Sequence, residues 1–127
     1  MPAKKYSKEL FKRKLYPVFK DSGVKLAYLF GSQAKGKTGP LSDVDIALLW
    51  PQTKTSTMLF SLKLQAKIRA IFKDERIEIG SLNNQAISFC YQVIKDGYCI
   101  FGKKEDSVYY ETRAVSEYLD FLYFAKQ

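Results

Sequence analysis

Two aspartates, Asp43 and Asp45, are separated by one residue and continue into an apolar run, "IALLW". This run is typical of a buried β-strand, and residues two apart on a strand project from the same face. Two neighbouring carboxylates repel each other unless a cation lies between them. Hard oxygen ligands of this kind suit Mg²⁺, which keeps several waters and accepts phosphate oxygens. The pair therefore predicts a magnesium site for a phosphorylated substrate.

A Gly-Ser pair, Gly31 and Ser32, precedes the aspartates at the end of "VKLAYLF", a stretch rich in strand-forming residues. Glycine lets the backbone approach a ligand closely, and a serine hydroxyl and free N–H groups at a helix start bind phosphate oxygens. Lys35 and Lys37 add positive charge to the same turn. These residues predict a triphosphate-binding turn beside the metal site.

A third acidic residue, Glu78, occurs in the alternating stretch "RIEIG". Alternation places Ile77 and Ile79 on one face of a strand and Glu78 on the other. If this strand neighbours the aspartate strand, Glu78 completes a three-carboxylate site. Such a site can hold two metal ions, one on the triphosphate and one on the attacking hydroxyl of an in-line displacement. Each feature alone is also typical of turns, caps and salt bridges, so the prediction rests on their combination.

The elements that position these residues alternate between helices and strands, which predicts an α/β fold of a small sheet flanked by helices, in a single domain over residues 1–127. The expected elements are a basic helix capped by Ser7 and reaching about Phe19, a strand over 24–30, a strand over 43–50 ended by Pro51, a helix from Ser56 or Thr57 to Phe72, a strand over 76–82, a helix capped by Asn83 or Asn84 and reaching about Ile94, a strand over 98–102, and a helix over about 105–125.

Two of these helices have further sequence features. Pro17 is expected to bend or shorten the end of the first helix. The apolar stripe of the second helix consists of Leu59, Leu62, Ala66, Ile68, Ile71 and Phe72.

The composition excludes several chemistries. The chain has 127 residues, no histidine and two cysteines, so Ser-His and Cys-His nucleophile pairs and imidazole zinc sites are excluded. Cys90 and Cys99 form no CxxC pattern and are expected to be reduced core residues. Neither a membrane span nor a secretion signal is evident, so we expect a cytoplasmic protein.

Positive charge is concentrated at the N-terminus. The whole chain has a net charge of +8, and residues 1–20 contain seven Lys and Arg against Glu9 alone, which gives +6 for that segment (seven minus one). One interpretation is a solvated helix face; the other is contact with RNA, phosphate or an acidic protein surface. The RNA alternative predicts an affinity that falls steeply with salt and with deletion of residues 1–14.

The last expected helix is apolar around most of its circumference. Core packing explains part of this pattern, but Tyr110, Phe121 and Phe124 fall outside the main apolar face, which indicates a homodimer or heterocomplex contact. The main face consists of Val108, Tyr109, Val115, Tyr118, Leu119, Leu122 and Tyr123.

The stretch "FGSQAKGKTGPLSDVDIALL" resembles the G-S-x10-D-x-D signature of the DNA polymerase β-like nucleotidyltransferases, and specifically the minimal nucleotidyltransferase (MNT) antitoxins that occur beside HEPN toxins. The resemblance covers residues 24–101. It implies the nucleotidyltransferase fold, with a small mixed sheet, and transfer of AMP from ATP to a hydroxyl, with release of pyrophosphate. It also implies that the acceptor is a tyrosine of a HEPN toxin, a ribonuclease that the modification silences.

The resemblance also implies residue roles. Gly31, Ser32 and Lys35 would hold the triphosphate, Asp43 and Asp45 would bind both metal ions, and Glu78 would bind the catalytic metal and help deprotonate the acceptor. Two positions depart from the family pattern: Lys35 stands where arginine is common, and Glu78 where aspartate is usual.

Three alternatives stay open at the level of sequence. The chain could neutralise its partner by docking alone, with catalysis weak or lost through Glu78. It could transfer a nucleotide to another hydroxyl acceptor. It could also use its basic first segment as an RNA-binding arm.

Overall fold

The protein is described here by a computed structural model that covers residues 7–31 and 44–126. Residues 1–6, 32–43 and 127 lie outside the described parts. Helices and strands alternate along most of the chain, as the sequence predicts. In chain order they are α1 (Lys8–Ser22), β1 (Leu26–Phe30), β2 (Val44–Leu49), α2 (Thr57–Phe72), β3 (Ile77–Ser81), α3 (Ile87–Asp96), β4 (Tyr98–Phe101) and α4 (Lys104–Ala125).

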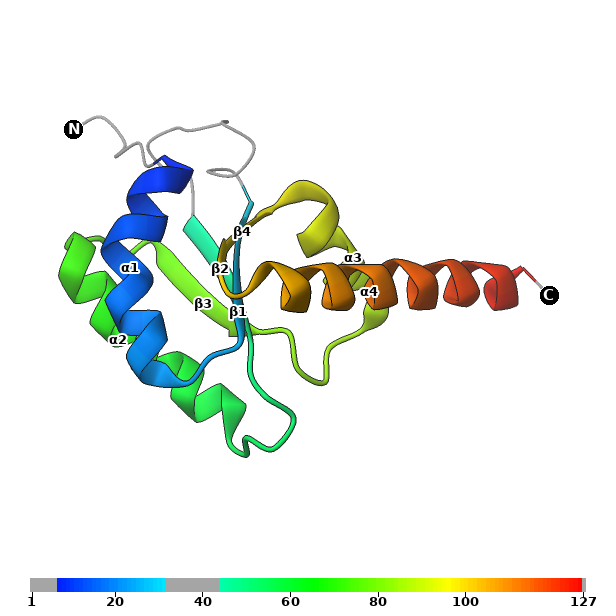
Figure 1. Cartoon of the computed structure of the whole chain (residues 1–127), viewed down its shortest axis with the longest axis horizontal. Helices are drawn as coiled ribbons and strands as arrows, with labels where there is room; N and C mark the ends of the chain where they lie inside the picture. The colour runs from blue at the N-terminus through cyan, green and yellow to red at the C-terminus, as the bar shows by residue number, and fades with distance from the viewer. Residues whose placement is uncertain (1–6, 32–43, 127) are drawn as a thin grey trace.

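The strands form one four-stranded sheet in the order β3-β2-β1-β4 (Figure 1). β1 is antiparallel to both β2 and β4, whereas β2 and β3 are parallel. A parallel pair needs a crossover connection, and α2 supplies it. The predicted α/β fold with a mixed sheet is therefore confirmed.

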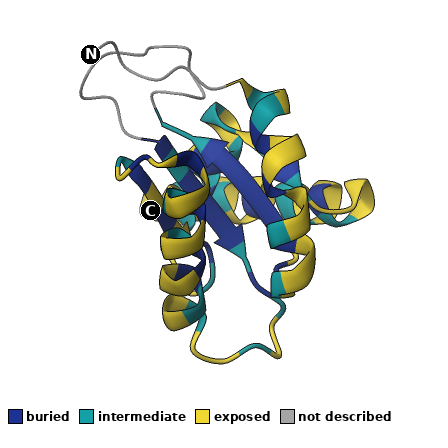
Figure 2. Cartoon of the chain, turned by 90° about the vertical axis from the view of Figure 1, so that its left-hand side faces the viewer, coloured by how far each residue is buried: buried dark blue, intermediate teal, exposed yellow. Residues whose placement is uncertain are grey.

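Helices cover both faces of the sheet, and buried strands lie between exposed helix surfaces (Figure 2). α1 and α2 pack on one face, while α3 and the start of α4 pack on the other. Because β1 and β2 are central, both of their faces are covered, which explains why their side chains are almost continuously apolar. Both cysteines are unpaired, and Cys90 belongs to the second core. Among the described helices, none is long and apolar enough to cross a bilayer.

α1 begins where it was predicted and ends later. The Ser7 hydroxyl accepts a hydrogen bond from the Leu10 amide at 3.1 Å, so Ser7 is the N-cap. The helix then continues past Pro17 to Ser22, and Gly23 ends it in a left-handed conformation. The expected end near Phe19 was wrong because Pro17 lies on the exposed face of the helix, where its ring does not disturb the packed face.

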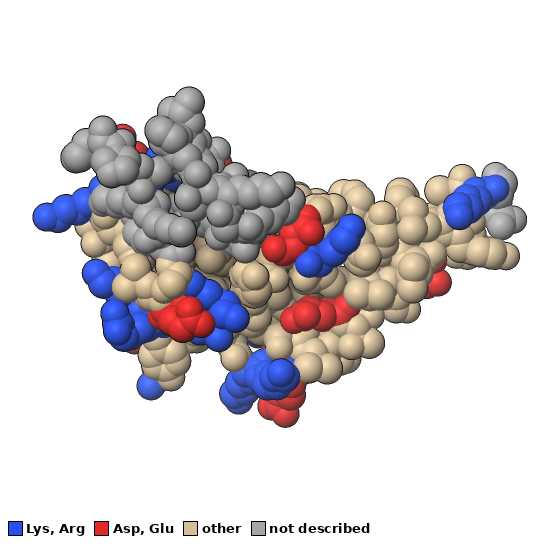
Figure 3. Space-filling view, turned by 90° about the horizontal axis from the view of Figure 1, so that it is seen from above, with Lys and Arg blue, Asp and Glu red and all other residues tan. Residues whose placement is uncertain are grey.

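The exposed face of α1 is basic. Lys12, Arg13, Lys14 and Lys20 all point to solvent, and Figure 3 shows Lys and Arg side chains gathered toward the α1 and α2 end of the molecule. This arrangement fits a solvated helix face and equally fits a polyanion contact. RNA contact therefore stays a prediction.

The buried stripe of α2 differs from the predicted one. Leu59, Leu62 and Ile71 are exposed, and the face toward the sheet is instead formed by residues at i, i+3, i+7 and i+11. Ser61 begins this stripe, and its hydroxyl accepts a hydrogen bond from Trp50 Nε1 at 3.0 Å in the core. The prediction failed because a buried serine looks polar in the sequence. The buried residues are Ser61, Leu64, Ile68 and Phe72.

Asn83 connects two strands and caps no helix. Its Oδ1 accepts from the Trp50 amide at 2.8 Å, and its Nδ2 donates to the Trp50 carbonyl at 2.9 Å. α3 begins only at Ile87, with Ala86 at the N-cap position. The predicted cap at Asn83 or Asn84 was therefore wrong, because Asn83 satisfies the backbone at the end of β2 instead.

α4 is fixed to the body of the protein by its first half and middle. Tyr28 in β1 donates a hydrogen bond to Glu111 Oε2 at 2.8 Å. Burial, together with this hydrogen bond, raises the pKa of Tyr28 far above its usual value, so the phenol stays protonated as the donor. Further along, the rings of Tyr91 and Tyr118 stack with centroids 4.0 Å apart. The rest of α4 extends away from the sheet (Figure 1).

We expect Asn83→Ala to lower the free energy of unfolding by about 1–3 kcal/mol, because it leaves the backbone N–H and carbonyl of Trp50 without the side-chain amide that binds them. Gln85→Ala, which removes an exposed amide two residues away, should change it by less than about 0.5 kcal/mol. Urea titrations of the two variants measure the difference. Equal losses would show that Asn83 does not connect the strands.

Candidate active site

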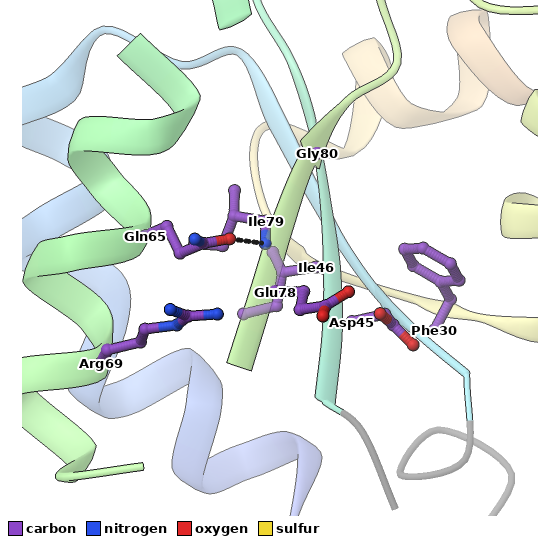
Figure 4. A pocket seen from close by; sticks show the side chains of 8 residues that line it. All are labelled: Phe30, Asp45, Ile46, Gln65, Arg69, Glu78, Ile79 and Gly80. Atoms are coloured by element: carbon purple, nitrogen blue, oxygen red, sulfur yellow. Dashed lines mark hydrogen bonds between the residues drawn. The ribbon is translucent and has the colours of Figure 1, made fainter. Parts of the chain in front are cut away.

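Asp45 and Glu78 lie side by side on neighbouring strands. They are direct partners in the parallel register of β2 and β3, so their side chains project from the same face of the sheet. Figure 4 shows the two carboxylate groups next to each other near the strand ends. Asp45 is half-buried and Glu78 is exposed. The condition on which the site depended, that the strand of Glu78 neighbours the aspartate strand, is thus met.

Gly31 packs against the Asp45 carboxylate from the other side. Its φ angle is +83°, and a Cβ atom at this position would lie 2.5 Å from Asp45 Oδ2. Any side chain here would strain the backbone and push the carboxylate aside. The glycine therefore lets the backbone lie against the Asp45 carboxylate, and its predicted contact with a triphosphate stays a prediction.

Four of the predicted residues, Ser32, Lys35, Lys37 and Asp43, lie outside the described residues. The structure thus brings together Gly31, Asp45 and Glu78 from the predicted site, and their roles stay predictions.

Two neighbouring carboxylates are hard oxygen donors that fit a divalent cation such as Mg²⁺. Among residues 7–31 and 44–126, however, no group of three or more His, Cys, Asp and Glu side chains comes together. The donor set is therefore complete only if Asp43 joins Asp45 and Glu78, as the sequence predicts.

A cavity of about 290 Å³ opens beside the carboxylate pair. It extends from β1 across β2 and β3 to α2, and it combines acidic, basic, amide and apolar groups (Figure 4). The lining residues are Phe30, Asp45, Ile46, Gln65, Arg69, Glu78, Ile79 and Gly80.

The sequence reasoning missed two polar residues of this cavity, Gln65 and Arg69. They are one helical turn apart on α2 and bind the outer edge of β3: Gln65 Oε1 accepts from the Ile79 amide at 2.8 Å, and Arg69 Nε donates to the Ile77 carbonyl at 2.7 Å. The side chains thus take the place of a further strand. The only sequence signal was a polar pair with i, i+4 spacing, which is common on solvent-exposed helices.

Phe30 forms the opposite wall of the cavity. It directly precedes Gly31 and pairs with Asp45 across the antiparallel strands β1 and β2. Its ring contacts Phe89 of α3 edge-on, with centroids 5.9 Å apart. α3 therefore fixes the β1 side of the site, as α2 fixes the β3 side.

Comparison with known proteins assigns this arrangement to a family. Residues 13–106, which include all four strands and both described carboxylates, match the family Polymerase beta, Nucleotidyltransferase. The chain belongs to this family. As a nucleotidyltransferase it shows the mixed sheet and the carboxylates on neighbouring strands that the sequence resemblance predicts.

Individual relatives of this nucleotidyltransferase are similar along nearly the whole chain. Protein adenylyltransferase MntA of Shewanella oneidensis is 27% identical over 112 residues, which cover 87% of this chain and 78% of the relative. A chain in a crystal structure of a toxin–antitoxin with AMP-PNP superposes with a TM-score of 0.77 at 23% identity, covering 91% of this chain and 92% of that one.

A second solved structure contains a tri-AMPylated Shewanella oneidensis HEPN toxin in complex with MNT antitoxin. One of its chains superposes with a TM-score of 0.72 at 21% identity, covering 94% of this chain and 93% of that one. At these identities the superpositions show that the nucleotidyltransferase fold is shared.

Gly31→Ala should disable nucleotidyl transfer, whereas Gly23→Ala should not. Both glycines have a positive φ, +83° and +84°, so each alanine should cost about 1–2 kcal/mol of stability. Only the Cβ of Ala at position 31 meets the Asp45 carboxylate, since nothing lies within 4 Å of the corresponding atom at Gly23. Urea unfolding and a transfer assay on both variants test this. Equal activity of the two would contradict the role of Gly31.

Proposed function

We propose that the protein is a Mg²⁺-dependent adenylyltransferase that transfers AMP from ATP to a tyrosine hydroxyl of a HEPN toxin and thereby acts as its antitoxin in the cytoplasm. The observation that carries this proposal is the side-by-side placement of Asp45 and Glu78 against Gly31. Two carboxylates at this spacing are suited to a cation that a triphosphate shares.

The proposed site has a phosphate-binding part and a metal-binding part. Gly31, Ser32 and Lys35 would hold the triphosphate. Asp43, Asp45 and Glu78 would hold Mg²⁺, and they could hold two ions if all three carboxylates converge. When bound, the metal neutralises phosphate charge and makes the acceptor hydroxyl a better nucleophile. In the reaction the acceptor oxygen bonds to the α-phosphorus, the bond from that phosphorus to the bridging oxygen breaks, and pyrophosphate leaves.

Glu78 is available to take the hydroxyl proton. Its side chain is exposed, and within the described part of the chain it has no ion-pair partner. Glutamate reaches further than the aspartate that is usual in the family, by one methylene. Because Glu78 lies on an edge strand, the cavity leaves room for this longer side chain.

The relatives support the proposal that ATP is the nucleotide donor and that a HEPN toxin is the partner. One is named a protein adenylyltransferase, and solved structures with the same fold contain AMP-PNP or an AMPylated HEPN toxin with its antitoxin. These names describe the relatives. They favour ATP as donor and a HEPN protein as acceptor for this chain.

The exposed surface of α4 is the proposed docking site for that partner. Much of the predicted apolar face is indeed exposed, but Tyr110, predicted outside it, packs into the second core, and Tyr118 stacks on Tyr91. On the face that Figure 3 shows, most of the projecting part of α4 carries neither acidic nor basic side chains. An apolar surface of this kind is rarely left uncovered. The α4 apolar surface consists of Val108, Tyr109, Val115, Leu119, Phe121, Tyr123 and Phe124.

Asp45→Asn and Glu78→Gln should each lower transfer of label from ATP to the partner by about a hundredfold or more. Each replaces a carboxylate that would hold the metal, and the metal would stabilise the negative charge on the phosphates during transfer. Glu75→Gln removes an exposed acid near the start of β3 and should leave the rate unchanged. Glu78→Asp should retain activity. A wild-type protein that transfers no more label than Asp45→Asn would contradict the enzymatic proposal.

The same variants separate catalysis from docking. If the chain neutralised its partner by binding alone, Asp45→Asn would neutralise it as well as the wild type does. We expect it to fail in a cell-growth assay while it still binds the partner in a pull-down.

Leu119→Glu should weaken binding of the partner by roughly tenfold or more, because it places a charge in the proposed interface. Leu62→Glu on α2 is the matched control, since the two leucines are similarly exposed, at 58% and 50%. Titration calorimetry measures both affinities, and light scattering reports whether the chain dimerises through α4 instead. A dimer that Leu119→Glu dissociates, with partner binding unchanged, would overturn this interface.

A further inference from the structure

Arg69 lies beyond the carboxylate pair, at the outer edge of the sheet. β3 is the edge strand, and Arg69 of α2 binds its outer side through the Ile77 carbonyl. In Figure 4 its guanidinium ends beside β3, on the α2 side of that strand, while the Glu78 carboxylate lies on the other side of the strand, toward Asp45 and Phe30. The order across the site is therefore Gly31, Asp45, Glu78 and Arg69.

The guanidinium of Arg69 is held in place but keeps most of its donors. Within residues 7–31 and 44–126 only its Nε makes a hydrogen bond, to the Ile77 carbonyl, and Arg69 lines the cavity, so its terminal N–H groups are available to a ligand there. Arg69 forms no ion pair with any residue that the structure describes. A half-buried arginine that the backbone orients and that no described acid neutralises is suited to bind a planar anionic group of a ligand.

The geometry of phosphoryl transfer indicates which ligand that is. In an in-line displacement the leaving group and the attacking oxygen lie on opposite sides of the phosphorus. If the triphosphate lies at the Gly31 turn, pyrophosphate leaves on the β1 side and the acceptor must approach from the β3 side. The cavity wall formed by Arg69, Gln65 and Ile79 is on that side.

We propose that this part of the cavity is the acceptor pocket, and that Arg69 binds a carboxylate of the acceptor protein close to the hydroxyl that is modified. The inference rests on the proposed function. A carboxylate fits better than a neutral carbonyl because the arginine fork can donate two parallel hydrogen bonds to it. Arg69 would thus select acceptors with an acidic residue beside the target tyrosine.

The test compares two synthetic acceptors, the peptides Ala-Glu-Tyr-Glu-Ala and Ala-Gln-Tyr-Gln-Ala, with labelled ATP and Mg²⁺. The wild type should modify the acidic peptide with the higher kcat/KM, by roughly tenfold to a hundredfold. Arg69→Met should remove this preference and raise the KM for the acidic peptide, with the KM for ATP unchanged. Arg69→Lys, which keeps the charge without the fork, should retain part of the preference.

Lys67→Met is the matched control, because Lys67 is an exposed cation on the same helix. It should leave the preference as in the wild type. Urea unfolding of each variant separates a loss of binding from a loss of the hydrogen bond to β3. A structural defect would change the KM for ATP and lower the rate with both peptides alike.

The outcomes distinguish the two proposals. If the wild type modifies peptides without a preference, or Arg69→Met keeps the preference, the acceptor pocket is wrong while the adenylyltransferase stands. If the wild type binds ATP but labels neither peptides nor partner, both proposals fail.

Discussion

The pairing of two carboxylates on adjacent strands is the constraint on which the site depends. The register of β2 and β3 makes Asp45 and Glu78 direct neighbours, so their oxygen donors project from the same face of the sheet. Such a pair suits a hard cation that brings its own phosphate ligands. The rest of the site is arranged around this pair, since Gly31 holds the backbone against Asp45 and the cavity leaves Glu78 open to solvent.

The helices around the sheet hold the strands that carry the two carboxylates in place. Two cores, one on each face, hold β1 and β2 rigid, and each strand that flanks them is supported differently. The edge of β3 is closed by Gln65 and Arg69, which protects the strand that carries Glu78 without adding another strand. α4 contributes to the second core with its first half and leaves the remainder exposed. This exposed part of α4 is the surface on which we propose that the partner docks.

The sequence predicted those parts that depend on local periodicity. The position of Glu78 followed from alternation along β3, because one-sided burial fixes the period of a strand. The signature that joins Gly31 to Asp45 was readable for a similar reason, since chemistry restricts both residue types. Contacts that depend on tertiary structure were not readable: Ser61 is buried only because Trp50 donates to it, and Asn83 connects strands that are 33 residues apart in sequence. In the sequence Arg69 cannot be distinguished from a solvent-exposed arginine, because its contact with β3 depends on how α2 packs on the sheet.

Binding of Mn²⁺ as a probe for the metal, in the presence of AMP-PNP, tests the central claim most directly. Paramagnetic resonance can measure the affinity of the wild type, Asp45→Asn, Glu78→Gln and the double variant. If the two carboxylates share one cation, each single replacement should lower the affinity by about tenfold or more, and the double variant should lose much less than the product of the two losses. Unchanged affinity in Glu78→Gln, or losses that simply multiply, would contradict a shared cation and with it the proposed site.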